Sequence, residues 1–348
     1  ANLSTAHMGA FAQFAATSQF FLYGRRHCTS TGYSRAASAY GGGADLHHLD
    51  LSGKVFAVTG ANSGVGRSLA GYFAARGGTV YMLCRSKERA AAARDEIVGE
   101  TSNPNVHVIL ADLSLRSDCR RAIGELAAHA SRLDCLVCNA GVLLNERTET
   151  AEGHEVTFAT HLLCGSYLLP RLALPLLRKA ADPRVVFVSS GGMYNTRWPG
   201  AERGSCSAGQ PYNGQLAYAY AKRGQVLLAE RLSKLLPAVT FVSCHPGWAD
   251  TPAVEAAYGA AKRLLAPMRT PWQGAEGIAW LAVCPRDELE PGGFYLDRRP
   301  QAKHMAGPFF SEGSFTKNSE EEVGAMLRLL DGLAGLEPLG AVDGLSSC

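Results

Sequence analysis

The chain has 348 residues, a formal net charge of +3 and 47 % hydrophobic residues, which is enough for one large core with extensions. The charge is too small to indicate a nucleic-acid-binding protein. The most apolar stretch, residues 162–177, is interrupted by Pro170, Arg171 and Pro175. We expect a buried amphipathic helix there and no transmembrane span.

Residues 1–44 contain no Asp or Glu and carry Arg25, Arg26 and Arg35. An acid-free, arginine-bearing N-terminus is typical of an organellar targeting segment, and it favours a mitochondrial location. The alternative is a basic amphipathic arm that docks on a protein partner or on a membrane surface. Both interpretations stay open for residues 1–50, which we treat as an N-terminal arm.

From Leu51 onward, short apolar runs alternate with alanine-rich amphipathic stretches. This alternation predicts a Rossmann-type, doubly wound α/β domain over residues 51–300, with helices on both faces of a seven-stranded parallel sheet. Strands are expected at 54–60, 79–85, 105–112, 133–141, 184–190, 239–247 and 292–297. Helices are expected at 64–76, 87–99, 117–130, 151–179, 217–236 and 273–283. Residues 301–348 form a tail with one helix at 319–333.

The ten cysteines are scattered, and the only close pair is Cys135 and Cys138. A C-x-x-C pair can indicate metal or redox chemistry. This pair lies in a short apolar run with no second pair and no ligand cluster beside it. We therefore expect buried thiols in a strand, a reducing compartment and no metal site.

A glycine-rich loop, "TGANSGVG", lies between the first expected strand and the first expected helix. Gly60, Gly64 and Gly66 permit a tight turn and a close approach of the backbone to phosphate, and the helix begins with free N–H groups. A glycine-rich loop in this position is a strong indication of dinucleotide binding.

The second strand ends at Cys84 and Arg85, where NAD-binding proteins of this fold carry an acidic residue that binds the ribose. Arg85 and Arg67 could instead clamp a 2′-phosphate with their two guanidinium groups. NADP(H) is therefore favoured over NAD(H).

Tyr218 and Lys222 are one helical turn apart on the same face of the helix expected at 217–236. A free phenol has a pKa of about 10, and a nearby ammonium group brings that pKa closer to neutrality. Such a pair can protonate a carbonyl oxygen. Tyr220 lies on another face of the helix.

These motifs, in this order, resemble the short-chain dehydrogenase/reductase family over residues 51–300, with a finer similarity to its retinol-dehydrogenase-like branch. "VSS" places Ser190 where the family polarises the substrate oxygen, Tyr218 falls on the acid/base position, and Lys222 falls on the lysine that holds the ribose. The resemblance and the glycine loop together imply these cofactor-binding residues: Gly60, Asn62, Ser63, Gly64, Val65, Gly66, Arg67, Arg85, Asp112, Leu113, Asn139, Ala140, Gly141, Tyr218, Lys222, Pro246, Gly247, Trp248 and Thr251.

One position departs from the family pattern. The family usually has an asparagine three residues after a phenylalanine, and here Phe158 is followed by His161. The asparagine binds a water that links the lysine to solvent. A histidine can also hold water and move protons near neutral pH. We interpret His161 as a substituted proton relay, and the alternative is a packed histidine in a site without catalytic demand.

The first hypothesis is an NADP(H)-dependent oxidoreductase that interconverts a carbonyl and an alcohol, with Ser190, Tyr218, Lys222 and His161 as its catalytic residues. Residues 252–272 are expected to form a lid, whose small and apolar residues indicate a lipophilic substrate. The second hypothesis is an accessory subunit of a larger, organellar complex that retains NADP(H) with little or no turnover. The resemblance implies a homodimer through the helices at 151–179 and 217–236, although those faces would also suit another partner.

Overall fold

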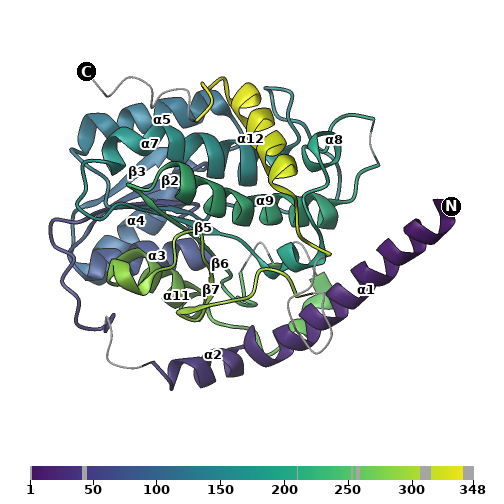
Figure 1. The fold of residues 1–348 in the computed structure, drawn as a ribbon. Helices are drawn as coiled ribbons and strands as arrows, with labels where there is room; N and C mark the ends of the chain where they lie inside the picture. Colours follow the sequence, from purple (N-terminus) through teal and green to yellow (C-terminus); the bar gives the residue numbers. More distant parts are fainter. Residues whose placement is uncertain are drawn as a thin grey trace.

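The computed structural model describes residues 2–40, 45–209, 211–251, 254–255, 259–305 and 315–339. Figure 1 shows a twisted central sheet between two layers of helices. The strands pair in the order β3-β2-β1-β4-β5-β6-β7-β8, and β1 to β7 are all parallel. The strands are β1 Val55–Thr59, β2 Thr79–Cys84, β3 Val106–Leu110, β4 Cys135–Cys138, β5 Arg184–Val188, β6 Thr240–Cys244, β7 Phe294–Leu296 and β8 Arg299–Pro300.

The predicted fold class is confirmed, with one addition at the edge of the sheet. All seven predicted parallel strands are present, because their continuous apolar runs suit burial on both faces. The additional strand β8 has two residues and pairs antiparallel with β7. The order of the strands reverses between β1 and β4, and ligands of such sheets bind outside the carboxyl ends of the strands at this point.

The helices divide between the two faces of the sheet. α3 (Gly64–Ala75), α4 (Lys87–Thr101) and α11 (Pro271–Val283) share one buried apolar cluster with the strands. α5 (Arg116–His129) and α9 (Gly214–Leu235) share the other cluster. Short helical segments also occur in the described chain: η2 Gly191–Asn195, α8 Ala201–Gly204, η3 Gly259–Leu265 and η4 Arg286–Glu288.

The helix expected at 151–179 begins only at Val156, because residues 151–155 form a turn and an isolated bridge, and it has three continuous parts. α6 (Val156–Phe158) leads into a π-helix, η1 (Ala159–Leu168), and then into α7 (Leu169–Leu177). π-Helical segments are rare and frequently occur at functional sites. His161 lies in this π-helical segment, on the face of the sheet that α9 also covers.

The two terminal parts of the chain pack on the domain. The arm forms α1 (Asn2–His27) and α2 (Ser30–Ala37), which lie along one edge of the domain in Figure 1. The tail forms α12 (Glu320–Ala334), which begins with the predicted Ser319 cap and packs against η1. α12 therefore covers part of the face through which the resemblance implied a dimer. No helix among the described residues is long and apolar enough to cross a membrane.

Candidate active site

The glycine-rich loop turns sharply at the end of β1. Gly60 and Gly64 have positive φ values of 65° and 54°, a region that favours glycine. A Cβ atom at Gly66 would lie 2.4 Å from the Gly60 carbonyl oxygen and 2.6 Å from Nδ2 of Asn139. Ser63 precedes α3 without a side-chain cap, so its hydroxyl accepts no hydrogen bond from the first N–H groups of the helix. This cradle fits the pyrophosphate of a dinucleotide.

The loop contacts two other predicted cofactor segments. A Cβ at Gly60 would stand 3.0 Å from Cα of Ala140, and one at Gly64 would stand 3.0 Å from the methyl group of Thr251. The "NAG" segment and Thr251 therefore border the glycine loop, as the predicted cofactor site requires. Val65 and Leu113 are buried in the apolar clusters, and their side chains contribute packing.

Thr59 connects the loop to the "NAG" segment, and its role was missed in the sequence. Its hydroxyl oxygen accepts hydrogen bonds from the backbone N–H groups of Asn139 and Ala140, both at 2.8 Å. The Asn139 side chain donates in return to the Thr59 carbonyl oxygen at 2.9 Å. The threonine that opens the glycine motif was the available signal, because a hydroxyl at the end of a buried strand needs a partner.

The two arginines predicted to clamp a 2′-phosphate differ in their surroundings. Arg85 is exposed, and its Nη1 lies 3.8 Å from Oδ2 of Asp112. Arg67 instead pairs with two carboxylates of α4, those of Glu96 at 2.9 Å and Glu100 at 2.8 Å. Two helix carboxylates therefore hold the Arg67 guanidinium within the chain, and the two-arginine clamp stays a prediction.

Tyr218 lies close to the loop that begins at Ser190. A Cβ at Gly192 would stand 3.5 Å from two ring carbons of Tyr218. Ser190 precedes η2, and its hydroxyl accepts a hydrogen bond from the Gly192 N–H at 3.3 Å. The preceding Ser189 is buried, and its hydroxyl donates to the Lys222 carbonyl oxygen at 2.8 Å. Of the two serines, Ser190 is the one available to a substrate.

Lys222 is 3 % exposed and lies beneath Tyr218. Its Nζ donates to the Val188 carbonyl oxygen at 2.8 Å and is 5.4 Å from the centroid of the Tyr218 ring. Burial lowers the pKa of Lys222 from 10.5 to about 7, and the nearby Cys244 and Cys138 oppose that shift. A polyanionic ligand beside the amine would favour the ammonium form.

His161 packs edge-on against Tyr218, with ring centroids 5.3 Å apart and an interplanar angle of 88°. Its Nε2 either accepts from the Val142 N–H at 3.0 Å or donates to the Val142 carbonyl oxygen at 2.7 Å, according to the tautomer. A Cβ at Gly141 would stand 2.4 Å from the imidazole. Burial, and secondarily the charge of Lys222, lowers the pKa of His161 well below 6.5, so the ring is neutral near pH 7.

Gln225 stabilises the π-helical segment that carries His161. Its Nε2 donates to the His161 carbonyl oxygen at 3.2 Å and to the Ser166 hydroxyl at 2.8 Å. A π-helical turn breaks the regular ladder of backbone hydrogen bonds, so a buried amide from α9 supplies a partner. The sequence offered no signal for this contact, because the pairing depends on how two helices meet.

The predicted nicotinamide segment lies between the domain and the arm. Gly247 is buried with a φ of 75°, and Pro246 is partly exposed. The Trp248 indole packs on α1, 6.3 Å from the ring centroid of Phe20 and 6.0 Å from that of Phe21. The Trp248 side chain therefore packs on the arm, and its predicted role at the cofactor stays a prediction. Of the predicted lid, residues 252–253 and 256–258 lie outside the described residues.

The fold and this set of residues define a dinucleotide-binding oxidoreductase site, and comparisons with known proteins specify the class. The family model for short chain dehydrogenases matches residues 54–200. The chain is 38 % identical over 321 residues to dehydrogenase/reductase SDR family member 12 of Bos taurus, covering 90 % of this chain and 96 % of that protein. It is 32 % identical over 265 residues to retinol dehydrogenase 12 of Bos taurus, covering 74 % and 82 %. The chain belongs to the short-chain dehydrogenase/reductase family of oxidoreductases.

Solved structures give the same fold. A protein of unassigned function from Mycobacterium paratuberculosis superposes with a TM-score of 0.64 at 26 % identity, covering 85 % of this chain and all of that chain. A short chain dehydrogenase from Escherichia coli CFT073, solved with NADPH, has a TM-score of 0.57 at 22 % identity, covering 70 % and 96 %. The second likeness supports the fold alone.

Proposed function

We propose that this chain is an NADP(H)-dependent reductase or dehydrogenase that interconverts a carbonyl and an alcohol on a lipophilic small molecule. The observation that carries the proposal is the convergence on Tyr218 of a buried lysine, a neutral histidine and the loop of Ser190. Each group comes from a different element, and the ring of Tyr218 contacts or faces all of them.

The residues present fit a dinucleotide. The glycine loop and the start of α3 would hold the pyrophosphate, and Arg85 would pair with a 2′-phosphate, since it is exposed and its nearest carboxylate is 3.8 Å away. Membership of the short-chain dehydrogenase/reductase family supports a nicotinamide cofactor. When bound, a nicotinamide supplies or accepts the hydride.

The side chains of this protein perform the proton chemistry. The Ser190 hydroxyl hydrogen-bonds to the substrate oxygen and holds it beside Tyr218, which transfers the proton to or from that oxygen. The ammonium form of Lys222 favours the phenolate of Tyr218, because an opposite charge stabilises the anion. His161, neutral near pH 7, exchanges one ring proton with water as the relay.

A lipophilic substrate is supported by two observations. One of the similar proteins is named for retinol, a lipophilic alcohol. Within the described part of the predicted lid, Leu264 is 64 % exposed, a large apolar side chain at the surface. The mitochondrial location stays a prediction. The alternative as an accessory subunit also stays a prediction, while Phe20, Tyr23 and Cys28 of the arm pack on their own domain.

The test is NADPH oxidation by the purified full chain with a panel of medium- and long-chain aldehydes and ketones, alongside NADPH binding by calorimetry. We expect tight binding and turnover that rises with the apolar length of the substrate. Tight binding without turnover on any substrate would overturn the enzymatic proposal. Turnover confined to short polar carbonyls would overturn the substrate class.

A further inference from the structure

One aromatic residue of the arm reaches the loops that carry the candidate site. The ring of Phe20 occupies the space beside Gly191, where a Cβ would come within 1.8 Å of its Cζ atom. The same ring lies 5.6 Å from the ring centroid of Tyr194, 6.2 Å from that of His245 and 6.3 Å from that of Trp248. Phe20 therefore touches both the loop after Ser190 and the segment predicted to lie on the nicotinamide.

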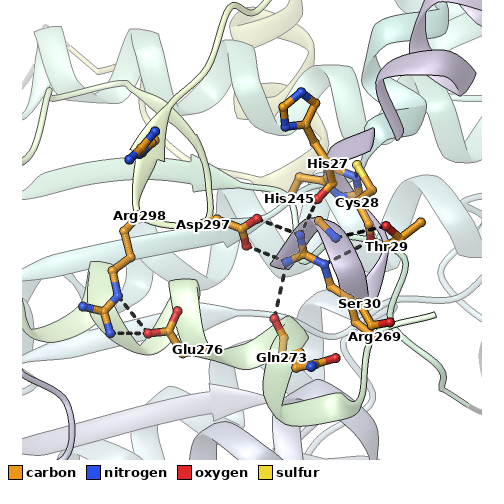
Figure 2. A network of polar contacts seen from close by, with 12 residues as sticks. His27, Cys28, Thr29, Ser30, His245, Arg269, Gln273, Glu276, Asp297 and Arg298 are labelled. Atoms are coloured by element: carbon orange, nitrogen blue, oxygen red, sulfur yellow. Dashed lines mark hydrogen bonds and ion pairs between the residues drawn. The ribbon is translucent and has the colours of Figure 1, made fainter. Parts of the chain in front are cut away.

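The end of α1 is fixed to the domain by a buried ion pair, which Figure 2 shows at its centre. Arg269 forms a two-point contact with Asp297, at 2.5 and 2.7 Å, and both residues are buried. The same guanidinium donates to the carbonyl oxygens of His27 at 2.6 Å and Cys28 at 3.0 Å. These carbonyls end the helix and have no helical partner of their own, so the arginine caps α1.

The backbone of the predicted nicotinamide segment is bonded to the arm directly. The Trp248 N–H donates to the Cys28 carbonyl oxygen at 2.7 Å, and Ser30 N–H donates to the Pro267 carbonyl oxygen at 2.9 Å. At Gly24, a Cβ would stand 2.2 Å from the Trp248 indole, so only glycine permits this approach. The backbones of the arm and of this segment are therefore in direct contact.

α1 uses one face for these contacts and leaves the other exposed. Ala16 and Gly24 are buried, and Tyr23 donates to the Gln301 side chain at 2.5 Å. In contrast, Phe14, which lies closer to the N-terminus of the same helix, is 71 % exposed. The docked part of α1 therefore fits the domain closely. Phe14 lies outside this contact and can serve as a control.

We propose that the arm contributes to the active site and that Phe20 is a positioning residue. The ring holds the backbone at Ser190–Gly191 and the segment His245–Trp248 at a fixed separation, and the Arg269–Asp297 pair holds the helix that carries the ring. This inference rests on the proposed function for its kinetic consequence, because the two loops bracket the place where substrate and nicotinamide meet. Its structural consequence, the fixed separation of the two loops, does not depend on the proposed function.

The test uses the full chain with Phe20→Ala, Phe20→Leu and the matched control Phe14→Ala. For Phe20→Ala we expect an unchanged fold, NADPH affinity within about threefold of the parent, and kcat lower by about 10- to 100-fold, since small misplacements of reacting groups cost this much. Phe20→Leu should recover part of the rate. Amide hydrogen exchange should quicken in residues 188–193 and 245–250 and stay unchanged in β1 and α3. Phe14→Ala should match the parent.

A double-mutant cycle addresses the contact itself. Gly191→Ala alone should disturb both loops, because its Cβ meets Phe20, and adding Phe20→Ala should restore their exchange rates towards the parent. Additive effects in the cycle would overturn the proposal, as would exchange that quickens evenly over the whole domain or a Phe20→Ala variant with parental kcat and exchange. If the parent shows no turnover, the proposed function fails, while the exchange data and the cycle still decide whether Phe20 positions the loops.

Arg269 is a weaker choice for mutation. Its removal would leave Asp297 buried and without its partner, which strongly destabilises a folded chain. Loss of the fold would then obscure any effect on the loops.

Discussion

Lys222 lies one helical turn after Tyr218 on α9, with its Nζ 5.4 Å from the centroid of the tyrosine ring. The amine is buried and reaches the end of β5 through the Val188 carbonyl oxygen. The pair therefore connects the carboxyl edge of the sheet to the proposed acid/base group. The charge state of Lys222 can therefore be tested through the pH dependence of stability.

The buried lysine predicts a particular dependence of stability on pH. The pKa of Lys222 is about 7 in the folded chain and 10.5 when exposed, so between these values the unfolded chain binds more protons. The free energy of unfolding should therefore rise with pH over this window. Lys222→Met removes the cost of the buried charge, and its Tm at pH 7 should exceed that of the parent by roughly 5 °C.

This advantage of Lys222→Met should shrink as the pH rises from 7 towards 10.5, and only above that value is the parent lysine neutral in both states. The exposed Lys179 gives the control, and Lys179→Met should leave Tm unchanged at every pH. Calorimetric scans from pH 6 to 10 make the comparison. A difference between the variant and the parent that is constant with pH would contradict the assigned burial effect.

Arg85 should determine the choice between the two nicotinamide cofactors. Arg85→Asp removes the proposed partner of the 2′-phosphate, so NADPH binding should weaken by more than about tenfold while NADH binding changes little. Arg94→Asp, an equal change of charge at a position of α4 whose side chain is 43 % exposed, is the control. Calorimetric titration with both nucleotides measures the ratio. Equal losses for NADPH and NADH with Arg85→Asp would rule out this role.

His161 can be tested against the residue that the family usually has. If the histidine is a relay, His161→Asn should retain turnover, because an asparagine can also hold a water. His161→Phe keeps the packing against Tyr218 and removes both ring nitrogens, so kcat should fall by roughly 100-fold with NADPH binding retained. Stopped-flow and steady-state rates would measure the effect. Parental turnover by His161→Phe would assign the histidine to packing alone.

The tail helix predicts the oligomeric state. Met326, Leu327 and Leu330 of α12 lie in the apolar cluster with η1 and α7, and the Arg171 guanidinium pairs with Asp331 at 3.1 Å. We expect the full chain to be a monomer in light scattering, since α12 covers part of the surface that a family-type dimer would use. A chain that ends at residue 318 should self-associate. A full-length dimer whose exchange protection maps to η1 and α9 would contradict this expectation.

The sequence predicted the sheet well because the parallel strands, apart from the edge strand β3, are buried on both faces and form continuous apolar runs. α1 was not predicted as a docked helix, because Phe20 and Tyr23 face the domain while Phe14 and Leu22 are exposed. With apolar side chains on both sides, the helix lacks the periodicity that indicates one buried face. Only the fold reveals which aromatic residues pack.

The candidate site also contains both residues that the sequence predicted and contacts that depend on the fold. Tyr218 and Lys222 were predicted from their spacing and Ser190 from the family resemblance, and the fold brings the three together. The partners of Arg67 could not be predicted, since Glu96 and Glu100 belong to the next helix and meet it only when α3 and α4 pack side by side. The contact between Trp248 and the arm was missed for the same reason, because more than 200 residues separate Cys28 from Trp248.

The most direct test of the account compares the parent with Tyr218→Phe, using Tyr220→Phe as the matched control on another face of α9. We predict NADPH oxidation by the parent and by Tyr220→Phe with the same carbonyl substrate. For Tyr218→Phe we predict unchanged NADPH affinity and a kcat lower by at least about 100-fold, because the proton donor is lost. Turnover of Tyr218→Phe at the parental rate would contradict the account.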